Sequence, residues 1–452
     1  MREIRIRDTL SGELAPLHSG DDVGIYACGP TVYGRIHIGN ARPFVVFSLL
    51  ARFLRKEGYR AKLVINVTDI NDKIYDAAGE AGRPSAEFAA EMTRLYIEDT
   101  DRLGVGRPDV EPLASETIAG IVALIEALIE SEHAYESGGD VYFRVRSFER
   151  YGKLSNRRPE DMDQGEEAGT ESLKEDSLDF ALWKAQKEGE DTAWDSPWGK
   201  GRPGWHIECS AMAEAELGPS FAIHGGGSDL VFPHHENEIA QSEAARGVPL
   251  ARFWMHNGMV EIDAEKMSKS EGNIFQLSEA LDRFGREAVV AYLVSGHYRQ
   301  PLAFSAEALE QAASGVERLR NFLREHPPGA GGGGEEDSFV TARRDGFLDA
   351  LADDFNTPRA MAEVFDLVSE GNKRDLPGAS DAIVELLEVV GLESLASAED
   401  GPDAEAERLL TEREQARGKG DFERADRIRD VLSGRGWEVR DGPDGARLVR
   451  RG

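Results

Sequence analysis

The chain has 452 residues and a formal net charge of -31, from 53 Lys and Arg against 84 Asp and Glu. This length suits two or three domains, each able to bury its own core. Two cysteines are too few for a disulfide framework, and no apolar run of signal-peptide type follows Met1. No apolar stretch reaches the roughly 18 residues of a membrane span. A cytoplasmic location is therefore expected.

The acidic charge argues against a nucleic-acid partner, because phosphate binding depends on Lys and Arg. Residues 401–452 differ from the rest, since they hold 12 acidic and 12 basic side chains and are therefore neutral. An acidic body with only 12 lysines in the chain also suits a halophilic protein of a salt-rich cell, where charges are screened and Asp and Glu favour solubility. The alternative is an ordinary acidic cytosolic protein.

The first elements form a predicted strand-helix-strand unit. Residues 23–28 (VGIYAC) and 62–67 (KLVINV) read as buried strands, and residues 43–57 carry apolar side chains at helical spacing. A right-handed crossover then predicts a parallel sheet. The loop 29–40 would lie at the C-terminal edge of that sheet, where ligands bind in open α/β folds.

Later elements are mostly helical. Residues 118–129 predict an apolar helix, residues 159–176 a surface loop, and the pattern after about residue 300 is helical almost throughout. The stretch 327–337 (PPGAGGGGEED) has linker composition and marks a domain seam.

The segment 28–40 (CGPTVYGRIHIGN) runs from a strand end into a helix start. Its small residues let the backbone approach a phosphate closely, and a helix N-terminus offers N–H groups and partial positive charge to an anion. His37 would add a hydrogen-bond donor. The alternative is a structural histidine in a loop.

The segment 266–270 (KMSKS) is a polar stretch after the strand-like residues 258–262. Lys266 and Lys269 would clamp phosphates as charge develops on a departing pyrophosphate. The alternative is that the two lysines are ordinary solvated surface residues. That alternative is weaker here, because a chain so poor in lysine is not expected to place two of them together by chance.

A plausible zinc ligand set consists of Cys28, Cys209, His234 and Glu238. His234 and Glu238 are four residues apart in a predicted helix, so both project from one face. On spacing alone, His235 or Glu236 would serve as well. Two buried structural cysteines beside a polar helix are the alternative.

Two further blocks surround these residues, 204–212 (GWHIECSAM) and 223–233 (IHGGGSDLVFP). Three consecutive glycines before Ser228 would let the backbone lie against a ligand, and Asp229 would bind ribose hydroxyls. A tight turn is the alternative.

Together these residues resemble the class I aminoacyl-tRNA synthetases, and specifically the cysteinyl-tRNA synthetase family. Residues 37–40 (HIGN) are similar to the family's HIGH element, and residues 266–270 match its KMSKS element. The blocks CGPTVY, GRPGWHIECSAM, IHGGGSDLVFPHHENEIAQSEA and FNTPRA are similar to the family's in order and spacing. The resemblance spans nearly the whole chain.

The resemblance implies an α/β fold of three parts. A Rossmann-type, parallel-sheet catalytic domain would span residues 1–300, with an insertion at about 80–200 and the KMSKS loop. A helical bundle would follow over 301–400, with its linker at 327–337, and a small C-terminal anticodon-binding module over 401–452.

The resemblance also implies a role for each site residue. The zinc ligands would be Cys28, Cys209, His234 and Glu238; the amino-acid pocket Thr31, Trp205 and His224; the catalytic residues His37, Lys266 and Lys269; and the ATP-binding residues His37, Asn40, Asp229 and Lys269. Gly34, Ala222 and Glu271 depart from the family pattern and receive no role.

The implied reaction joins L-cysteine to tRNA(Cys) through a cysteinyl-adenylate, with ATP and Mg²⁺. One zinc ion per subunit would select the thiol, because a soft thiolate binds zinc and an alcohol scarcely does. A monomer without membrane contact is expected.

Two rival functions are a ligase that passes cysteine from its adenylate to an amino-sugar, and a non-catalytic zinc protein that binds tRNA. The tail 401–452 argues against the first. His37 and the lysine pair argue against the second.

Overall fold

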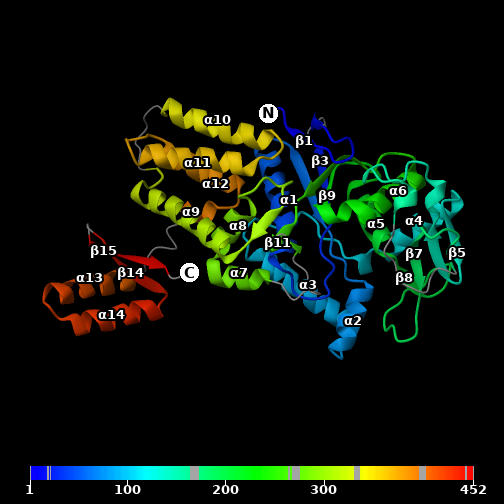
Figure 1. Ribbon diagram of the computed structural model, residues 1–452, viewed down its shortest axis with the longest axis horizontal. Coiled ribbons are helices and arrows are strands. Elements are labelled where there is room, and N and C mark those ends of the chain that lie inside the picture. Colours follow the sequence, from blue (N-terminus) through cyan, green and yellow to red (C-terminus); the bar gives the residue numbers. More distant parts are fainter. Residues whose placement is uncertain are drawn as a thin grey trace.

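The computed structural model describes residues 2–17, 20, 22–162, 173–262, 265–266, 275–329, 336–396, 404–442 and 445–450. Its centre is a four-stranded sheet in the order β10-β9-β3-β4. Strands β3 and β9 of this sheet are labelled in Figure 1. The strands are β3 (Asp22–Ala27), β4 (Arg60–Ile65), β9 (Phe221–Gly227) and β10 (Ala251–Asn257). All three pairings are parallel, with Ile25 opposite both Leu63 and Ile223, so the predicted parallel sheet is confirmed.

Helix α1 (Ile38–Lys56) connects β3 to β4 and buries a face of Phe, Val and Leu against the sheet. It begins at Ile38 rather than at residue 43, because its first turn is capped. The Nδ1 atom of His37 accepts the Gly39 N–H at 3.1 Å, and the Asn40 side chain accepts the His37 N–H at 3.2 Å. The prediction of a loop as far as residue 40 was therefore wrong by one helical turn.

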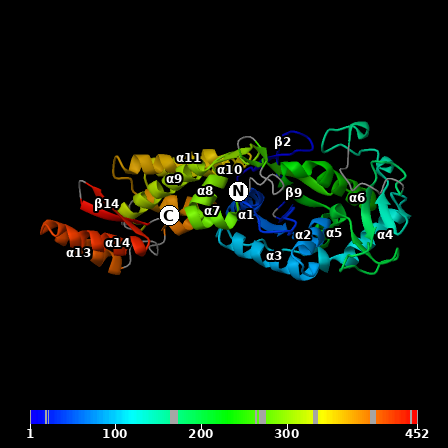
Figure 2. The ribbon, with the colours of Figure 1, turned by 60° about the horizontal axis from the view of Figure 1, so that its bottom comes forward.

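The chain leaves the central sheet after β4 and returns to it at β9. Between them lie α2 (Asp72–Glu80), α3 (Ser85–Asp101), α4 (Ile118–Glu130) and an antiparallel sheet of β5 (Ala134–Ser137), β6 (Asp140–Phe143), β7 (Phe180–Ala185) and β8 (Gly201–Pro203). The sheet and α4 enclose a core of their own that includes Ile125, Phe143 and Trp183. This part forms one end of the elongated molecule (Figure 2). Of the predicted loop 159–176, residues 163–172 lie outside the described residues.

Helix α5 (Trp205–Leu217) leads back to β9, and α6 (Glu236–Arg246) connects β9 to β10 through the single turn η5 (Val231–His235). Strand β11 (Val260–Ile262) then pairs with β12 (Glu265–Lys266) and with β13 (Leu302–Phe304). The helices α7 (Leu277–Phe284) and α8 (Arg286–Leu293) lie between them in sequence. A short hairpin, β1 (Arg5–Arg7) and β2 (Leu14–Pro16), precedes the central sheet.

In the described residues the predicted helical domain consists of the α-helices α9 (Ala306–Glu325), α10 (Ser338–Ala352), α11 (Thr357–Gly371) and α12 (Ala379–Val389). Its core is continuous with that of the central sheet, since Phe53 of α1 and Phe355 pack with ring centroids 6.4 Å apart. Of the predicted linker 327–337, residues 330–335 lie outside the described residues. No helix in the described part of the chain is long and apolar enough to cross a membrane.

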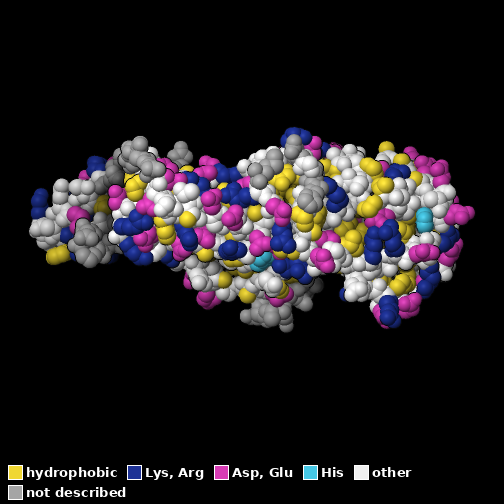
Figure 3. All heavy atoms as spheres, turned by 90° about the horizontal axis from the view of Figure 1, so that it is seen from above, with side chains coloured by type: hydrophobic (Ala, Val, Ile, Leu, Met, Phe, Trp, Pro, Cys, Tyr) yellow, Lys and Arg dark blue, Asp and Glu magenta, His cyan; other side chains and the backbone are white. Residues whose placement is uncertain are grey.

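The C-terminal module has a small core of its own. It consists of α13 (Ala404–Gly418), α14 (Phe422–Gly434), β14 (Trp437–Gly442) and β15 (Gly445–Arg450). Leu432 and Trp437 are buried in that core, which lies at the opposite end of the molecule from the β5–β8 sheet (Figure 1). Acidic and basic side chains are interspersed over the face seen in Figure 3, so the net negative charge does not form one patch there.

Candidate active site

A cavity of about 530 Å³ opens at the C-terminal edge of the central sheet. Six of the residues singled out from the sequence line it: Cys28, Thr31, His37, Asn40, Trp205 and Asp229. They come from the end of β3, the start of α1, the start of α5 and the turn after β9. The parallel sheet brings these segments together because the carboxyl ends of its strands share one edge.

The four predicted metal ligands, Cys28, Cys209, His234 and Glu238, form one buried cluster, of which Cys28 lines the cavity. Their ligand atoms are all within 4.8 Å of one another, and all four side chains are buried. The Oε1 atom of Glu238 lies 3.4 Å from Cys28 Sγ and 3.1 Å from His234 Nε2. Two thiols, one imidazole and one carboxylate are a donor set that zinc accepts in tetrahedral geometry.

The electrostatics of the four-residue cluster suit a cation. Burial lowers the pKa of His234, which keeps its imidazole neutral and its lone pair available. Burial also raises the pKa of the Cys28 thiol, and the neighbouring Cys209 and Glu238 raise it further. A bound metal ion would reverse that effect by favouring the thiolate. The residues present therefore fit a zinc ion.

A second possible ligand set overlaps the first. It replaces Cys209 and His234 by His224 and His235, and its atoms are equally close. The Nε2 atom of His235 lies 3.3 Å from Cys28 Sγ, and His224 Nε2 lies 2.8 Å from Glu238 Oε2. The alternative that spacing left open for His235 is thus also compatible with the geometry.

His224, predicted to line the amino-acid pocket, lies behind the cluster rather than in the cavity wall. Its side chain is fully buried between Glu238 and Trp254, whose ring it stacks on at 4.4 Å. Trp205, by contrast, is 37% exposed, lines the cavity and stacks on His234 at 4.3 Å. Of these two predicted pocket residues, only Trp205 lines the cavity.

Two buried histidines of the site were missed from the sequence. His206 lies 2.9 Å from His234 through their Nδ1 atoms, and His256 lies 2.8 Å from His235. His256 lies one residue before the end of strand β10, and His206 follows Trp205 at the start of helix α5. A histidine within a buried element was the available signal, because burying a polar ring requires a partner.

The nucleotide side of the cavity begins at the α1 N-terminus. His37 and Asn40 cap this helix, so the N–H groups of its first turn already have acceptors: Ile38 donates to the Phe275 carbonyl, Gly39 to His37 Nδ1 and Asn40 to the His37 carbonyl. What the helix start offers an anion in the cavity is the partial positive charge of its dipole. Gly39 is required here, since a Cβ atom would lie 2.9 Å from the His37 ring. Gly34, which departs from the family pattern, also lines the cavity.

Two of the three glycines at 225–227 serve packing of the core rather than the predicted contact of the backbone with a ligand. A Cβ atom at Gly225 would lie 2.1 Å from the Phe47 ring, and one at Gly226 would lie 2.9 Å from His235. These two glycines permit close packing in the core. Only Gly227 lines the cavity, where a Cβ atom would lie 2.5 Å from Asp229 Oδ1.

The predicted phosphate clamp is described only in part. Lys266 lies in β12, whose backbone pairs with Glu261 and Ile262 of β11. Lys269 and Glu271 lie outside the described residues. Ala222, the third departure from the family pattern, is buried in β9.

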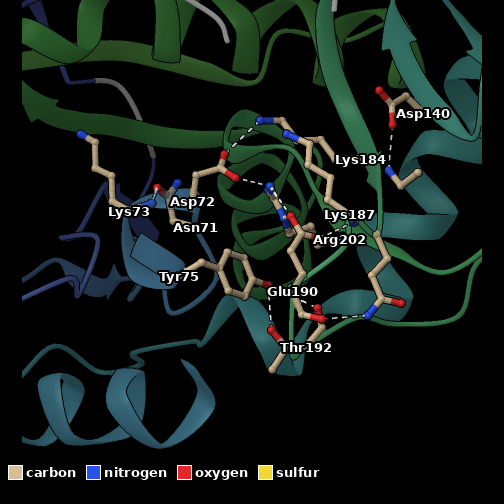
Figure 4. A network of polar contacts seen from close by, with 12 residues as sticks. Asn71, Asp72, Lys73, Tyr75, Asp140, Lys184, Lys187, Glu190, Thr192 and Arg202 are labelled. Carbon is tan, nitrogen blue, oxygen red and sulfur yellow. Dashed lines mark hydrogen bonds and ion pairs between the residues drawn. The ribbon is translucent and has the colours of Figure 1, made fainter. Parts of the chain in front are cut away.

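A polar network joins α2 to the β7 and β8 strands beside the cavity (Figure 4). The Arg202 side chain is 2% exposed and forms ion pairs with Asp72 and Glu190, and Lys184 Nζ donates to Asp72 at 3.0 Å. Arg202 also lies over the Tyr75 ring at 5.3 Å. The network fixes the strand that leads directly into Trp205, and nothing in the sequence pattern singled it out.

Three family descriptions match consecutive parts of the chain. They are "tRNA synthetases class I (C) catalytic domain" over residues 14–314, "DALR domain" over 346–392 and "Cysteinyl-tRNA ligase anticodon binding domain" over 399–447. Among solved structures, methionyl-tRNA synthetase from Mycobacterium tuberculosis in complex with methionyl-adenylate superposes with a TM-score of 0.63 at 16% identity, covering 83% of this chain and 92% of that one. This likeness concerns the fold.

Three relatives of similar length are named cysteine–tRNA ligase. The protein from Brevibacillus brevis is 43% identical over 469 residues, covering 99% of this chain and 100% of the relative. That from Halorhodospira halophila is 46% identical over 464 residues, covering 99% of both. That from Alkalilimnicola ehrlichii is 47% identical over 447 residues, covering 95% of both. The chain therefore belongs to the cysteine–tRNA ligase family of class I aminoacyl-tRNA synthetases.

Proposed function

We propose that the chain joins L-cysteine to tRNA(Cys) at the expense of ATP, through a cysteinyl-adenylate. The observation that carries the proposal is the juxtaposition in one cavity of Cys28 and Trp205 with His37, Asn40 and Asp229. Adenylation of cysteine requires a group that binds the substrate thiol and, next to it, a helix N-terminus that binds the nucleotide. The shared name of the full-length relatives supports the same activity.

On the amino-acid side, Cys28, Cys209, His234 and Glu238 would hold the zinc ion. When bound there, zinc supplies a soft Lewis acid that prefers a thiolate to an alcohol. Trp205, which stacks on His234, and Thr31 would line the pocket for the cysteine side chain. His224 would act through its hydrogen bond with Glu238, fixing the orientation of that carboxylate.

On the nucleotide side, the α1 N-terminus would bind the ATP phosphates, assisted by His37 and Asn40. Asp229 would accept hydrogen bonds from the ribose hydroxyls. The cysteine carboxylate then attacks the α-phosphate, and pyrophosphate leaves with its Mg²⁺. Lys266 and Lys269 would stabilise the charge that develops on the departing phosphates. Most of the rate enhancement would come from this positioning and charge stabilisation.

The C-terminal module would bind the tRNA(Cys) anticodon, in agreement with the family description that matches it. Its neutral charge balance removes the electrostatic objection that the acidic body raises. We propose a cytoplasmic monomer. The amino-sugar ligase is the less favoured alternative, because that reaction has no use for an anticodon-binding module.

Charging of total tRNA with L-cysteine tests the proposal. We expect cysteine-dependent, ATP-dependent acylation of tRNA and no acylation of an amino-sugar acceptor. Repeating the assay in dilute buffer and in high KCl tests the proposed salt-rich cell, because full activity in dilute buffer would remove that idea. Acylation of the sugar in place of tRNA would overturn the proposed acceptor.

A further inference from the structure

Arg42 in α1 is a fully buried cation whose acceptors are all backbone carbonyls. Its Nη1 atom donates to the carbonyl oxygens of Gly258 at 2.6 Å and Met259 at 3.2 Å, and its Nη2 atom donates to that of His297 at 3.3 Å. Burial lowers its pKa to about 10, so the side chain stays charged at neutral pH. Packing alone would be served as well by an apolar side chain, because burying a cation costs several kcal/mol.

Two of the carbonyls that Arg42 binds, those of Gly258 and Met259, lie in a turn that forms part of the cavity wall. Asn257 and Met259, on either side of Gly258, both line the cavity on its nucleotide side together with Asp229. The Gly258 N–H donates to the Tyr298 carbonyl at 2.7 Å, and a Cβ atom at Gly258 would lie 2.3 Å from the Gln300 carbonyl. Residues 298–300 and Arg42 therefore both hold this turn, and Arg42 also binds the neighbouring His297 carbonyl.

Arg42 also belongs to the helix whose N-terminus carries His37 and Asn40. The start of this helix is joined to residues 275–277 by two backbone hydrogen bonds, from Ile38 N–H to the Phe275 carbonyl and from Leu277 N–H to the Ile36 carbonyl, each 3.1 Å. The polar contact of this helix with the turn at Gly258 is made by the Arg42 side chain. A guanidinium reaches three carbonyls at once because its donors are spread in a plane, which a lysine ammonium cannot do.

We propose that Arg42 is a positioning residue for adenylation. It sets the distance between the phosphate-binding start of α1 and the wall formed by Asn257 and Met259, and so the geometry in which ATP is held. This inference rests on the proposed function. An error of about 1 Å in such a distance is enough to lower a rate roughly a hundredfold.

The test uses Arg42→Lys and Arg42→Met, with Arg55→Met as the matched control. Arg55 lies on the same helix and also donates to a carbonyl, that of Ala61 at 2.9 Å, but neither Ala61 nor its other partner, Asp109, lines the cavity. The readouts are ATP-pyrophosphate exchange with varied ATP, the same exchange with varied cysteine, and thermal unfolding.

We expect Arg42→Lys to lower kcat/KM for ATP by about tenfold or more, with the KM for cysteine within about twofold of wild type and little change in Tm. Arg42→Met should lower kcat/KM for ATP further, and Arg55→Met should leave it unchanged. Wild-type kinetics in Arg42→Lys would overturn the role, as would equal losses for ATP and cysteine that follow the folded fraction. Absence of exchange in the wild-type enzyme would instead refute the proposed function.

Discussion

The Sγ atom of Cys28 lies 3.4 Å from the Oε1 atom of Glu238, although 210 positions separate these residues in the sequence. The same carboxylate is 3.1 Å from His234 Nε2 and 2.8 Å from His224 Nε2. One buried side chain therefore connects the end of β3, the turn before α6 and the strand β9. A metal ion at this point would link the walls of the cavity as well as contact a substrate.

Metal content should distinguish the two overlapping ligand sets. Cys209→Ala is expected to lower zinc from about one ion per chain to well below one, because it removes one of four ligands. Zinc X-ray absorption of the wild-type protein should fit two sulfur ligands. Ser210→Ala is the control, since Ser210 is a buried neighbour on the same helix whose hydroxyl binds Gln241. Full zinc in Cys209→Ala, with one sulfur ligand, would favour the set with His224 and His235.

Asp229→Asn should raise the KM for ATP about tenfold and leave the KM for cysteine unchanged. A hydrogen bond that involves a charged group contributes about 1.5 to 3 kcal/mol, and the substitution keeps the size of the side chain while removing its charge. Steady-state pyrophosphate exchange measures both constants. Asp161→Asn, an exposed site outside the cavity wall, is the control. An unchanged KM for ATP would remove the ribose-binding role.

Arg202→Met should lower the free energy of unfolding by about 3 to 5 kcal/mol, because it leaves Asp72 and Glu190 without their buried partner. The value should lie toward the lower end, since the Asp72 side chain is 35% exposed. Urea unfolding measures the change. Arg60→Met breaks an exposed pair with Asp22 and should change the free energy of unfolding far less, because solvent screens that pair. If the two variants lowered the free energy of unfolding equally, burial of the network would make no contribution to stability.

The same network predicts a pH dependence. Burial alone would raise the pKa of Asp72, but Lys184 and Arg202 outweigh it, and the pKa lies below the ordinary value. A carboxyl group with a lowered pKa stabilises the folded chain at neutral pH and loses that effect as the pH falls through its folded pKa. The stability difference between wild type and Asp72→Asn should therefore be constant near pH 7 and shrink below about pH 4. A difference that grows on acidification would be inconsistent with this assignment.

The parallel sheet and the helical domain were predictable because they depend on local patterns. The buried runs at residues 23–28 and 62–67 lie within one residue or two of the observed β3 and β4. Cys28, Trp205 and Asp229 were predictable because each lies in a short block of distinctive residues at a strand or helix end. These are the positions where a parallel sheet gathers ligands.

What could not be predicted depends on contacts distant in the sequence. Arg42 binds carbonyls 216 and 217 positions away, and Arg202 binds Asp72 across 130 positions. Charged residues in a helix or strand are usually solvated, so neither arginine stood out. The glycines at 225 and 226 were assigned to a ligand because the sequence does not indicate that Phe47 and His235 pack against them.

Selection of the substrate thiol can be measured through the rates of pyrophosphate exchange with L-cysteine and L-serine. In the zinc-loaded wild-type enzyme, kcat/KM should favour cysteine by roughly 10⁴-fold or more, whereas shape alone would give only about 10- to 200-fold. Cys209→Ser should lose most of that preference together with its zinc, and Ser210→Ala should retain both. A Cys209→Ser enzyme that lacks zinc and still prefers cysteine as strongly as wild type would show that the buried cluster does not read the thiol.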